Sequence, residues 1–264
     1  MDFKDKVIWI TGASSGIGEH LAYAFSKRGS KLALTARNET GLETVRQQCD
    51  HPEDVFTFIL DVSEHKKAPD AAKRIIDHFG RIDLLINNAG ISQRALVKDT
   101  LLEVDQKIMD VNFFGTVAIT KAVLPYMLAQ QSGQIVVMSS LMGKFATDLR
   151  SAYAASKHAL HGFFDALRLE VLKDNISVTL ICPGFVNTNV SKNALKGDGQ
   201  KSNKMDDGQA GGYTGTEFAE KALKVIAAKK QEAVIARARE KLAIVIKRFY
   251  PALLTRILSR AKTI

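Results

Sequence analysis

Short apolar runs alternate with longer helical patterns along almost the whole chain, and this alternation restricts the fold more than any other feature. Successive residues of each run are apolar, which is typical of strands buried on both faces. We predict strands at residues 7–11, 31–36, 55–60, 82–87, 134–139, 176–181 and 233–236, with the longest helices near 102–130 and 152–173. The pattern therefore predicts an α/β fold: a doubly wound, seven-stranded parallel sheet with helices on each face.

The alternation predicts one domain at residues 1–236, because no linker rich in Pro or Ser interrupts it. Two segments depart from the pattern. Residues 187–215 hold few large apolar side chains and many Gly, Lys, Asn and Asp residues, so we expect a long lid loop there. Residues 237–264 form a basic C-terminal extension with apolar side chains at helical spacing and a helix-breaking Pro251.

The net charge of +9 is concentrated in this extension. Residues 237–264 contain eight Lys and Arg residues and one acid, Glu240, so they carry +7 and leave only +2 for the rest of the chain. A role in binding nucleic acid is therefore not expected. Two alternatives stay open for the extension: a helix docked on its own domain or on a partner subunit, and an amphipathic helix lying on an anionic membrane.

The cysteines and the first residues indicate a cytoplasmic protein, at most peripheral to a membrane. Cys49 and Cys182 match no metal or redox spacing, so we expect reduced thiols and no metal site. The charged first residues run directly into a strand, unlike a secretory signal. No apolar run in the sequence reaches the roughly 20 residues that cross a bilayer.

The turn after the first predicted strand reads Thr-Gly-Ala-Ser-Ser-Gly-Ile-Gly. Its glycines allow a sharp turn and let a pyrophosphate approach the N–H groups that open the following helix; they are Gly12, Gly16 and Gly18. The other candidate cofactor contacts in the turn are Ser14, Ser15 and Ile17. Such a turn can be a plain strand-to-helix connection, but its place at the first junction predicts a dinucleotide-binding, or Rossmann, domain.

The end of the second predicted strand selects between the two nicotinamide dinucleotides. An acid there would bind the ribose 2′-hydroxyl of NAD, whereas a base would accept the 2′-phosphate of NADP. This strand ends without an acid and is followed by Arg37. Glu39 lies further on, where we expect it to open the next helix with Asn38 as N-cap. We therefore predict a preference for NADP(H), and use of NAD(H) as well stays open because Ser15 offers no second base.

Tyr153 and Lys157 lie one helical turn apart, and Ser140 lies upstream of them. A phenol has a pKa of about 10, so a tyrosine needs a neighbour that lowers its pKa before it can act as a base near neutrality. Residues i and i+4 share a helix face, and we expect the Lys157 ammonium to lower the Tyr153 pKa. The Ser140 hydroxyl would orient a substrate oxygen. Alone, the spacing is also typical of a surface lysine packed along an aromatic ring.

Together these motifs resemble the short-chain dehydrogenase/reductase family over residues 5–236. The resemblance implies hydride transfer between NAD(P)(H) and a carbonyl or secondary alcohol, a homodimer or homotetramer, and four catalytic residues, Asn112, Ser140, Tyr153 and Lys157. Asn112 would hold a water for proton relay, and Tyr153 and Lys157 would also contact the cofactor. The remaining implied cofactor contacts are Asp61, Val62, Asn88, Ala89, Gly90, Pro183, Gly184, Val186 and Thr188.

Candidate substrate contacts follow the same motifs: Gln93, Ser140, Met142 and Phe185. Most neighbouring positions are apolar, which favours a hydrophobic substrate such as a lipid, a steroid or another ketone. The alternative is a catalytically silent, cofactor-binding regulatory or scaffold protein on the same fold. That class predicts damage to the Ser, Tyr, Lys or Asn position, and all four residues are present.

Overall fold

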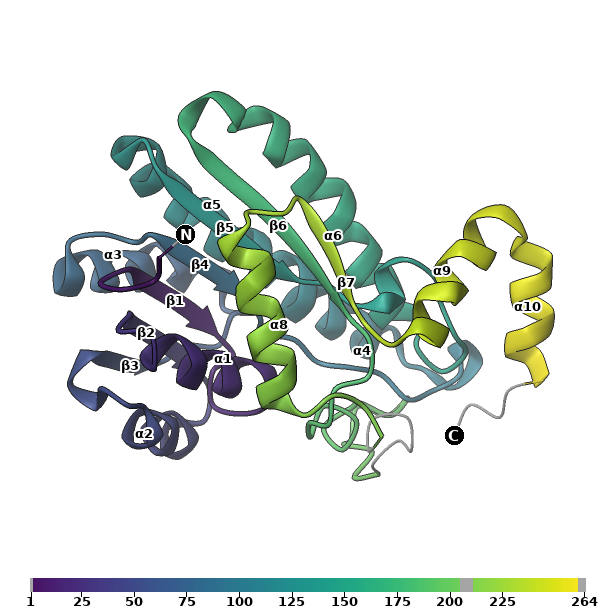
Figure 1. Ribbon diagram of the computed structural model, residues 1–264. Helices are drawn as coiled ribbons and strands as arrows, with labels where there is room; N and C mark the ends of the chain where they lie inside the picture. The colour runs from purple at the N-terminus through teal and green to yellow at the C-terminus, as the bar shows by residue number, and fades with distance from the viewer. Residues whose placement is uncertain (1, 205–210, 261–264) are drawn as a thin grey trace.

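A parallel sheet of seven strands forms the centre of the molecule, in the order β3-β2-β1-β4-β5-β6-β7 (Figure 1). The structure, a computed structural model, describes residues 2–204 and 211–260. Its strands are β1 Val7–Thr11, β2 Lys31–Ala36, β3 Val55–Ile59, β4 Leu84–Asn87, β5 Gly133–Met138, β6 Ile176–Pro183 and β7 Glu232–Ile235. All neighbouring strands pair in parallel, so the predicted doubly wound α/β fold is confirmed.

The chain reverses its direction of travel across the sheet between β1 and β4, which are neighbours. From β1 the chain builds outward to β2 and β3, then returns to β4 and builds outward to β7. Loops after β1 and β4 therefore leave in opposite directions, and a crevice opens between them at the carboxyl ends of the strands. This crevice is where the predicted site residues gather.

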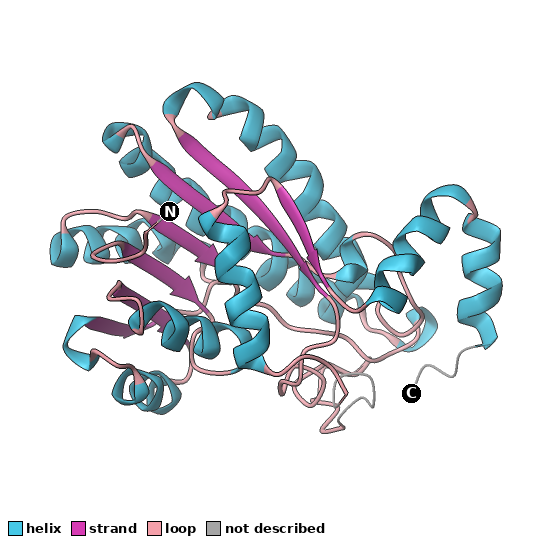
Figure 2. Ribbon diagram, viewed as in Figure 1, coloured by secondary structure: helices cyan, strands magenta, loops and turns pink. Residues whose placement is uncertain are grey.

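Helices cover both faces of the sheet (Figure 2). They are α1 Gly16–Ser26, α2 Glu39–Gln48, α3 Ala68–Phe79, α4 Leu102–Met109, α5 Gly115–Gln130, α6 Ser151–Glu170, α8 Gly215–Ala227, α9 Ala238–Phe249 and α10 Pro251–Arg260. Helix α1 lies beside α8 on one face, and α3, α5 and α6 pack on the other. The two longest predicted helical stretches are confirmed to within three residues at their ends.

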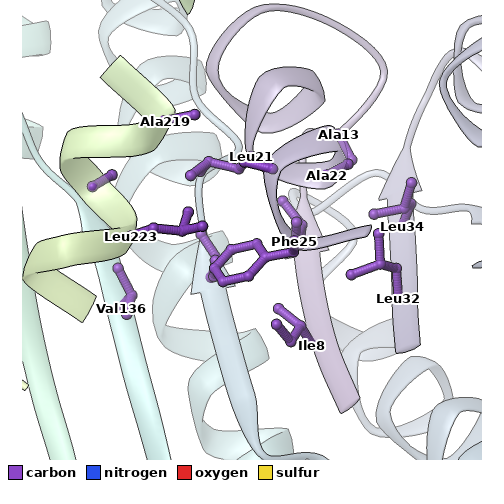
Figure 3. Packing of buried hydrophobic residues seen from close by; sticks show 14 of the residues in the cluster. Ile8, Ala13, Leu21, Ala22, Phe25, Leu32, Leu34, Val136, Ala219 and Leu223 are labelled. Carbon is purple, nitrogen blue, oxygen red and sulfur yellow. The ribbon is translucent and has the colours of Figure 1, made fainter. Parts of the chain in front are cut away.

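The alternation of side chains along β1 shows why each strand is apolar throughout. Ile8 and Ile10 face the α1 and α8 side, where Phe25, Leu21 and Leu223 lie (Figure 3). Val7 and Trp9 face the opposite layer, under α3, α5 and α6. Each fully buried side chain of this size contributes about 1.5–3 kcal/mol of hydrophobic free energy. Two separate apolar layers thus hold the sheet rigid beneath the crevice.

The stretch Leu102–Gln130 is the one helical run among the described residues that is long and apolar enough to cross a bilayer, contrary to the expectation from the sequence. It consists of α4, a π-helical turn at Asp110–Phe114, and α5. Ile119, Val123 and Met127 pack into the core against the sheet and α3. The composition of this run therefore reflects burial within the domain.

The C-terminal extension folds as a hairpin of α9 and α10, which projects beside the β7 edge of the sheet (Figure 1). Leu254 on α10 is only 3% exposed and packs with Leu141, Phe145 and Ala236. Glu240 on α9 accepts a hydrogen bond from Phe185 N–H at 2.8 Å. The inner face of the extension therefore packs on its own domain, which was one of the arrangements expected from the sequence.

The predicted lid at residues 187–215 contains no regular helix or strand over residues 187–204 and 211–214, whereas residues 205–210 lie outside the described part. Leu195 bridges to Gln93 and to Lys201, and Val186 bridges to Tyr213. These contacts fix the two described ends of the loop against the crevice.

Candidate active site

One cavity of about 1310 Å³ follows the carboxyl ends of the strands, from the glycine turn to the C-terminal hairpin. Most of the predicted site residues line it: Gly12, Ser14, Ser15, Gly16, Ile17, Arg37, Asp61, Val62, Asn88, Ala89, Gly90, Ser140, Met142, Tyr153, Lys157, Pro183, Gly184, Phe185, Val186 and Thr188. Three predicted residues do not line it: Gly18, Gln93 and Asn112. Residues far apart in sequence are thus assembled around one space.

The glycine turn fits a dinucleotide because its backbone is bare and open. Gly12 and Gly16 adopt φ values of +66° and +64°, in the left-handed region that favours glycine. A Cβ on Gly12 would lie 2.8 Å from Ala89 Cα, and a Cβ on Gly18 would lie 2.5 Å from Gly12 O. Side chains at these positions would therefore fill the cradle or force apart the chain beneath it.

Asn88 and Thr11 bind the glycine turn to the end of β4. The Asn88 side-chain amide donates to Thr11 O at 3.0 Å and to Gly12 O at 3.1 Å. In return, the Thr11 hydroxyl accepts the N–H groups of Asn88 and Ala89 at 3.0 and 3.1 Å. Asn88 therefore shapes the cofactor cradle through its side chain, a role that the linear sequence did not reveal.

Glu19 is a further residue at the start of α1 that sequence reasoning missed. Its carboxylate accepts a hydrogen bond from Gly16 N–H at 3.0 Å. An acid in the first turn of a helix is favoured by the helix dipole. N–H groups at a helix start also attract phosphate, and the phosphate site predicted at this turn stays a prediction.

Arg37 emerges at the end of β2 beside the cavity, as predicted, and its side chain is 59% exposed. Asn38 caps α2 by accepting Gly41 N–H at 3.1 Å, and Glu39 opens that helix, so this part of the sequence prediction is confirmed. Arg37 Nη1 lies 3.7 Å from Asp61 Oδ2. Burial raises the pKa of Asp61, but hydrogen bonds from Ser63 and the Arg37 charge outweigh it and hold this pKa below its ordinary value.

Tyr153, Ser140 and Lys157 meet at the middle of the cavity. Tyr153 and Lys157 share one face of α6, with Lys157 Nζ 5.8 Å from the centre of the tyrosine ring. The Ser140 hydroxyl hydrogen-bonds the Tyr153 side chain. Lys157 is 4% exposed, and its ammonium donates to Met138 O at the end of β5 at 2.8 Å. The hydroxyl, phenol and ammonium thus lie together on the wall of the cavity.

The charges that act on Tyr153 differ from the sequence prediction. Burial raises the Tyr153 pKa above its ordinary value, while the Ser140 hydrogen bond and the charges of Arg150 and Arg94 lower it only in part. Lys157 was expected to supply this lowering, but its ammonium is turned towards Met138 O. A tyrosine with a raised pKa holds its proton near neutrality, so it is prepared to donate that proton to a carbonyl oxygen.

Lys157 itself is strongly affected by burial, which lowers its pKa to about 8, although the Cys182 thiolate charge would act in the opposite direction. A buried amine loses hydration that favours its charged form. A rise in pH from neutrality to above 8 can therefore remove the positive charge of Lys157.

Asn112 is completely buried in the π-helical turn between α4 and α5. Its Oδ1 accepts Ile91 N–H at 2.8 Å, and its Nδ2 donates to Ile91 O at 2.9 Å and to Ser156 Oγ at 3.0 Å. π-helical turns of this kind are frequent at functional sites. The side chain joins the loop after β4 to α6, and the predicted relay role stays a prediction.

Gln93 has a role that differs from the predicted substrate contact. It is fully buried, and its Oε1 accepts Ala152 N–H at 2.9 Å and Tyr153 N–H at 3.4 Å. These N–H groups open α6 and have no partner within the helix, so Gln93 acts as its cap from a distance. It positions the helix that carries Tyr153, which the spacing in the sequence could not show.

The loop after β6 closes over the glycine turn, in keeping with the predicted nicotinamide side of the site. Thr188 side-chain carbons would lie 3.3 Å from a Cβ on Gly16. A Cβ on Gly184 would lie 2.6 Å from a carboxylate oxygen of Glu240 on α9. The C-terminal extension therefore touches the loop that borders the cavity.

A second polar network lies behind Lys157. His161 Nε2 is 3.0 Å from Ser139 Oγ, and its Nδ1 is 3.4 Å from Glu232 Oε2. The His161 hydrogen bond, opposed by burial and aided by Lys144, lowers the Glu232 pKa to about 2. This network ties α6 to β5 and β7, consistent with a packing role for His161. Among residues 2–204 and 211–260, no cluster of three or more His, Cys, Asp or Glu side chains could hold a metal.

Comparison with known proteins identifies the class to which this fold and site belong. Residues 6–199 match the family model for "short chain dehydrogenase". A "Dehydrogenase/reductase SDR family protein 7-like" from Anopheles gambiae is 46% identical over 239 residues, covering 88% of this chain and 75% of the relative. The "Dehydrogenase/reductase SDR family member 7B" of Mus musculus is 40% identical over 267 residues, covering 98% and 82% respectively. The chain belongs to the short-chain dehydrogenase/reductase family.

Solved structures give the same fold. A short-chain dehydrogenase/reductase from Burkholderia phymatum in complex with NAD superimposes with a TM-score of 0.83, at 22% identity over 96% of both chains. A short-chain dehydrogenase from Streptomyces avermitilis gives a TM-score of 0.82 at 24% identity, again over 96% of both chains. Family membership implies an oxidoreductase that uses a nicotinamide dinucleotide, and the cradle at Gly12 and Gly16 fits such a group.

The pKa of Lys157 gives a first testable prediction. If its ammonium binds an anionic dinucleotide, binding favours the charged form and raises its pKa above about 8. NADPH affinity should then be constant below pH 8 and fall up to about tenfold per pH unit above it, as one proton is taken up on binding. Fluorescence titration from pH 6.5 to 9.5 measures this. Lys157→Met should remove the dependence, whereas the exposed-site control Lys121→Met should keep it; a flat wild-type profile contradicts the assignment.

Proposed function

We propose that this protein is an NADP(H)-dependent oxidoreductase that interconverts a carbonyl and a secondary alcohol on a hydrophobic substrate, with Tyr153 as the acid and base. The observation that carries the proposal is the meeting of Tyr153, Ser140 and Lys157 in one cavity with the glycine turn. A bound NADP(H) would supply or accept the hydride. The chain's own residues would position the substrate and move the proton.

The protein groups divide these tasks by location. Ser140 holds the substrate oxygen next to Tyr153, and Tyr153 gives its proton to that oxygen as a carbonyl is reduced. Lys157 would contact the cofactor from the same wall of the cavity, and the charges of Arg150 and Arg94 would help to stabilise the tyrosinate that remains. Asn112 would hold a water, because its Oδ1 retains one acceptor position beyond the bond to Ile91.

A hydrophobic substrate is supported by the end of the cavity that lies beyond Tyr153. Its walls come from the segment after Ser140 and from both helices of the C-terminal hairpin; they are Leu141, Met142, Phe145, Leu242, Ile246, Leu254, Ile257 and Leu258. Phe185, a predicted substrate contact, is 41% exposed at the rim. An apolar chain or ring system would lose contact with water there without burying unpaired polar groups.

NADP(H) is favoured over NAD(H) by the electrostatics at the end of β2. Arg37 is exposed and lines the cavity, and its guanidinium can form paired hydrogen bonds with a phosphate. Asp61 lies within reach of Arg37 and would hold its fork in place. Use of NAD(H) as well stays open, since Ser15 contributes no positive charge.

The silent regulatory or scaffold alternative is less well supported. A protein that only sensed the cofactor would not need a phenol, hydroxyl and buried ammonium aligned on one wall. Here Gln93 and Asn112 additionally tie down the helix that carries Tyr153. Catalytic groups need such support, because their distance and orientation relative to the reacting bond must be held constant.

The outer face of the C-terminal hairpin supports association with an anionic membrane, at the cytoplasmic surface. Large apolar side chains that do not line the cavity stand exposed there: Val245, Phe249, Tyr250 and Leu253. Basic residues of the same two helices are also exposed: Lys241, Lys247, Arg248, Arg256 and Arg260. Apolar groups would enter the interface while the bases pair with lipid phosphates. Because the inner face of the same hairpin lines the cavity, a lipid-like substrate would have a short path to Tyr153.

Replacing the proton donor tests the catalytic proposal. Tyr153→Phe should lower kcat on a panel of carbonyls and alcohols by about 10²–10⁴, because positioned proton transfer is lost. NADPH binding, followed by fluorescence, should persist. Tyr126→Phe changes a tyrosine of α5 that does not line the cavity, and it should behave as wild type. A Tyr153→Phe enzyme with undiminished turnover would refute the role, and wild-type inactivity across the panel would favour the silent alternative.

Cofactor choice depends on one exposed side chain and is tested there. Arg37→Gln should weaken NADPH binding by about 10- to 150-fold, the loss expected for hydrogen bonds to a charged group. NADH has no 2′-phosphate, so its affinity should change little. Arg37→Lys retains the charge, so its NADPH affinity should lie between those of wild type and Arg37→Gln. Equal losses for both cofactors, measured by fluorescence titration, would show that Arg37 does not select the phosphate.

Vesicle sedimentation tests the membrane proposal on the full chain. Wild type should sediment with vesicles containing phosphatidylserine and much less with pure phosphatidylcholine. Phe249→Ser with Leu253→Ser should abolish sedimentation, whereas Leu169→Ser with Leu172→Ser changes equally exposed residues elsewhere and should not. If all variants and both lipids behave alike, the hairpin is not a membrane anchor.

A further inference from the structure

The C-terminal extension reaches the edge of the cavity through an acid in its first helical turn, Glu240. Strands β6 and β7 pair in parallel up to Pro183 and Ile235, so both end at the carboxyl edge of the sheet. Helix α9 begins directly after β7, and the loop after β6 leaves the sheet beside it (Figure 1). The sheet thus brings the first turn of α9 against the loop that borders the cavity.

Both carboxylate oxygens of Glu240 accept backbone N–H groups. Oε1 accepts Phe185 N–H of the loop after β6 at 2.8 Å, and Oε2 accepts Arg237 N–H at 2.7 Å. The bond to Arg237 belongs to a capping box, in which an acid of the first turn satisfies a donor at the start of its own helix. The bond to Phe185 lies outside the helix. One side chain therefore joins the start of α9 to the loop after β6.

The loop leaves space for this carboxylate at Gly184. A Cβ on Gly184 would lie 2.6 Å from Glu240 Oε1 and 2.7 Å from Ala236 Cβ. Gly184 N–H donates to Ile235 O at 2.9 Å, which continues the pairing of β6 with β7 into the loop. A side chain at this position would therefore force the acid, or the chain that leaves β7, away from the loop.

From this contact the loop runs to the glycine turn. Phe185 O accepts Tyr213 N–H at 3.0 Å, so the part of the lid that precedes α8 pairs with the same segment. Three residues further on, the side-chain carbons of Thr188 would lie 3.3 Å from a Cβ on Gly16. The bond between Glu240 and Phe185 therefore fixes one end of a segment that crosses the cavity from the sheet edge to the glycine turn.

The strand order indicates which half of a dinucleotide would meet this segment. We expect the pyrophosphate at the glycine turn after β1 and the adenosine ribose at the end of β2, beside Arg37. The other half would then extend across the point where the strand order reverses, to the side of β4, β5 and β6. Tyr153 and the loop after β6 line the cavity on that side. The loop would therefore border the nicotinamide half of the cofactor.

We propose that Glu240 is a positioning residue for the nicotinamide half of the cofactor, because its carboxylate holds the loop after β6 where that loop can contact the nicotinamide. The inference rests on the proposed function and adds to it a residue from the C-terminal extension. A carboxylate suits this task because its two oxygens accept two N–H groups, and hydrogen bonds to a charged acceptor are about twice as strong as neutral ones. The extension would thus serve the cofactor as well as the substrate.

Comparing a whole dinucleotide with its adenosine half tests the proposal. Fluorescence titration measures the Kd of NADPH, and calorimetry measures the Kd of 2′,5′-ADP, which has no nicotinamide. Glu240→Ala should weaken NADPH binding at least about tenfold, as expected when hydrogen bonds to a charged group are lost, and should change the affinity for 2′,5′-ADP by less than about twofold. NADH and ADP give the same comparison without the 2′-phosphate.

Three variants separate the loop contact from a general loss of structure. Glu240→Gln keeps one side-chain oxygen for Phe185 N–H, so it should retain part of the NADPH affinity that Glu240→Ala loses. Gly184→Ala places the excluded Cβ between the loop and the acid, so it should reproduce the pattern of Glu240→Ala. Glu220→Ala removes an acid of α8 that pairs with Arg28 and does not line the cavity, so it should match wild type.

The possible outcomes distinguish this proposal from the catalytic one, because binding does not require turnover. Equal losses of NADPH and 2′,5′-ADP affinity in Glu240→Ala would show that the acid supports the whole domain, and an unchanged NADPH affinity would show that the loop does not depend on it. Either result overturns the positioning role, even where wild type reduces carbonyls. The expected affinity pattern in a protein that is inactive across the panel supports the positioning role and refutes only the proposed activity.

Discussion

The structure depends on the close contact between the glycine turn after β1 and the loop after β4. Thr11 and Asn88 lock these segments together, and Gly12 permits an approach that any Cβ would block. The contact lies where the strand order reverses, so it holds open the crevice that all later site residues line. Two apolar layers keep the strands fixed beneath it, which lets single hydrogen bonds at the carboxyl ends define positions in the site.

Helix α6 is the second element on which the chemistry depends. It carries Tyr153 and Lys157. Residues outside the helix hold it in place: Gln93 caps its start, and Asn112 donates a hydrogen bond to Ser156. Met138 O accepts a hydrogen bond from the Lys157 ammonium. These buried polar contacts are costly to break, because each leaves an unpaired group away from water. They explain how a phenol, a hydroxyl and an ammonium from separate segments keep a constant geometry.

The C-terminal extension has one face packed on the domain and one face exposed. Leu254 and its neighbours pack on the segment after Ser140 and complete the apolar part of the cavity. Phe249, Tyr250 and nearby bases remain exposed on the outside. Docking on the domain therefore leaves the proposed membrane contact possible, because the two use different side chains of the hairpin. The apolar substrate that we propose would contact the inner face.

Sequence alone determined the sheet, its helices and the segments that border the crevice, because apolar periodicity and glycine turns are local properties of the chain. It also predicted Arg37, Ser140, Tyr153 and Lys157 as site residues, because each belongs to a short motif. Only the tertiary structure decided that Gln93 caps α6, that Lys157 turns to Met138 O, and that Arg94 and Arg150 act on Tyr153. Electrostatic effects and helix caps supplied by distant residues depend on distances and burial in space, which no spacing along the chain can encode.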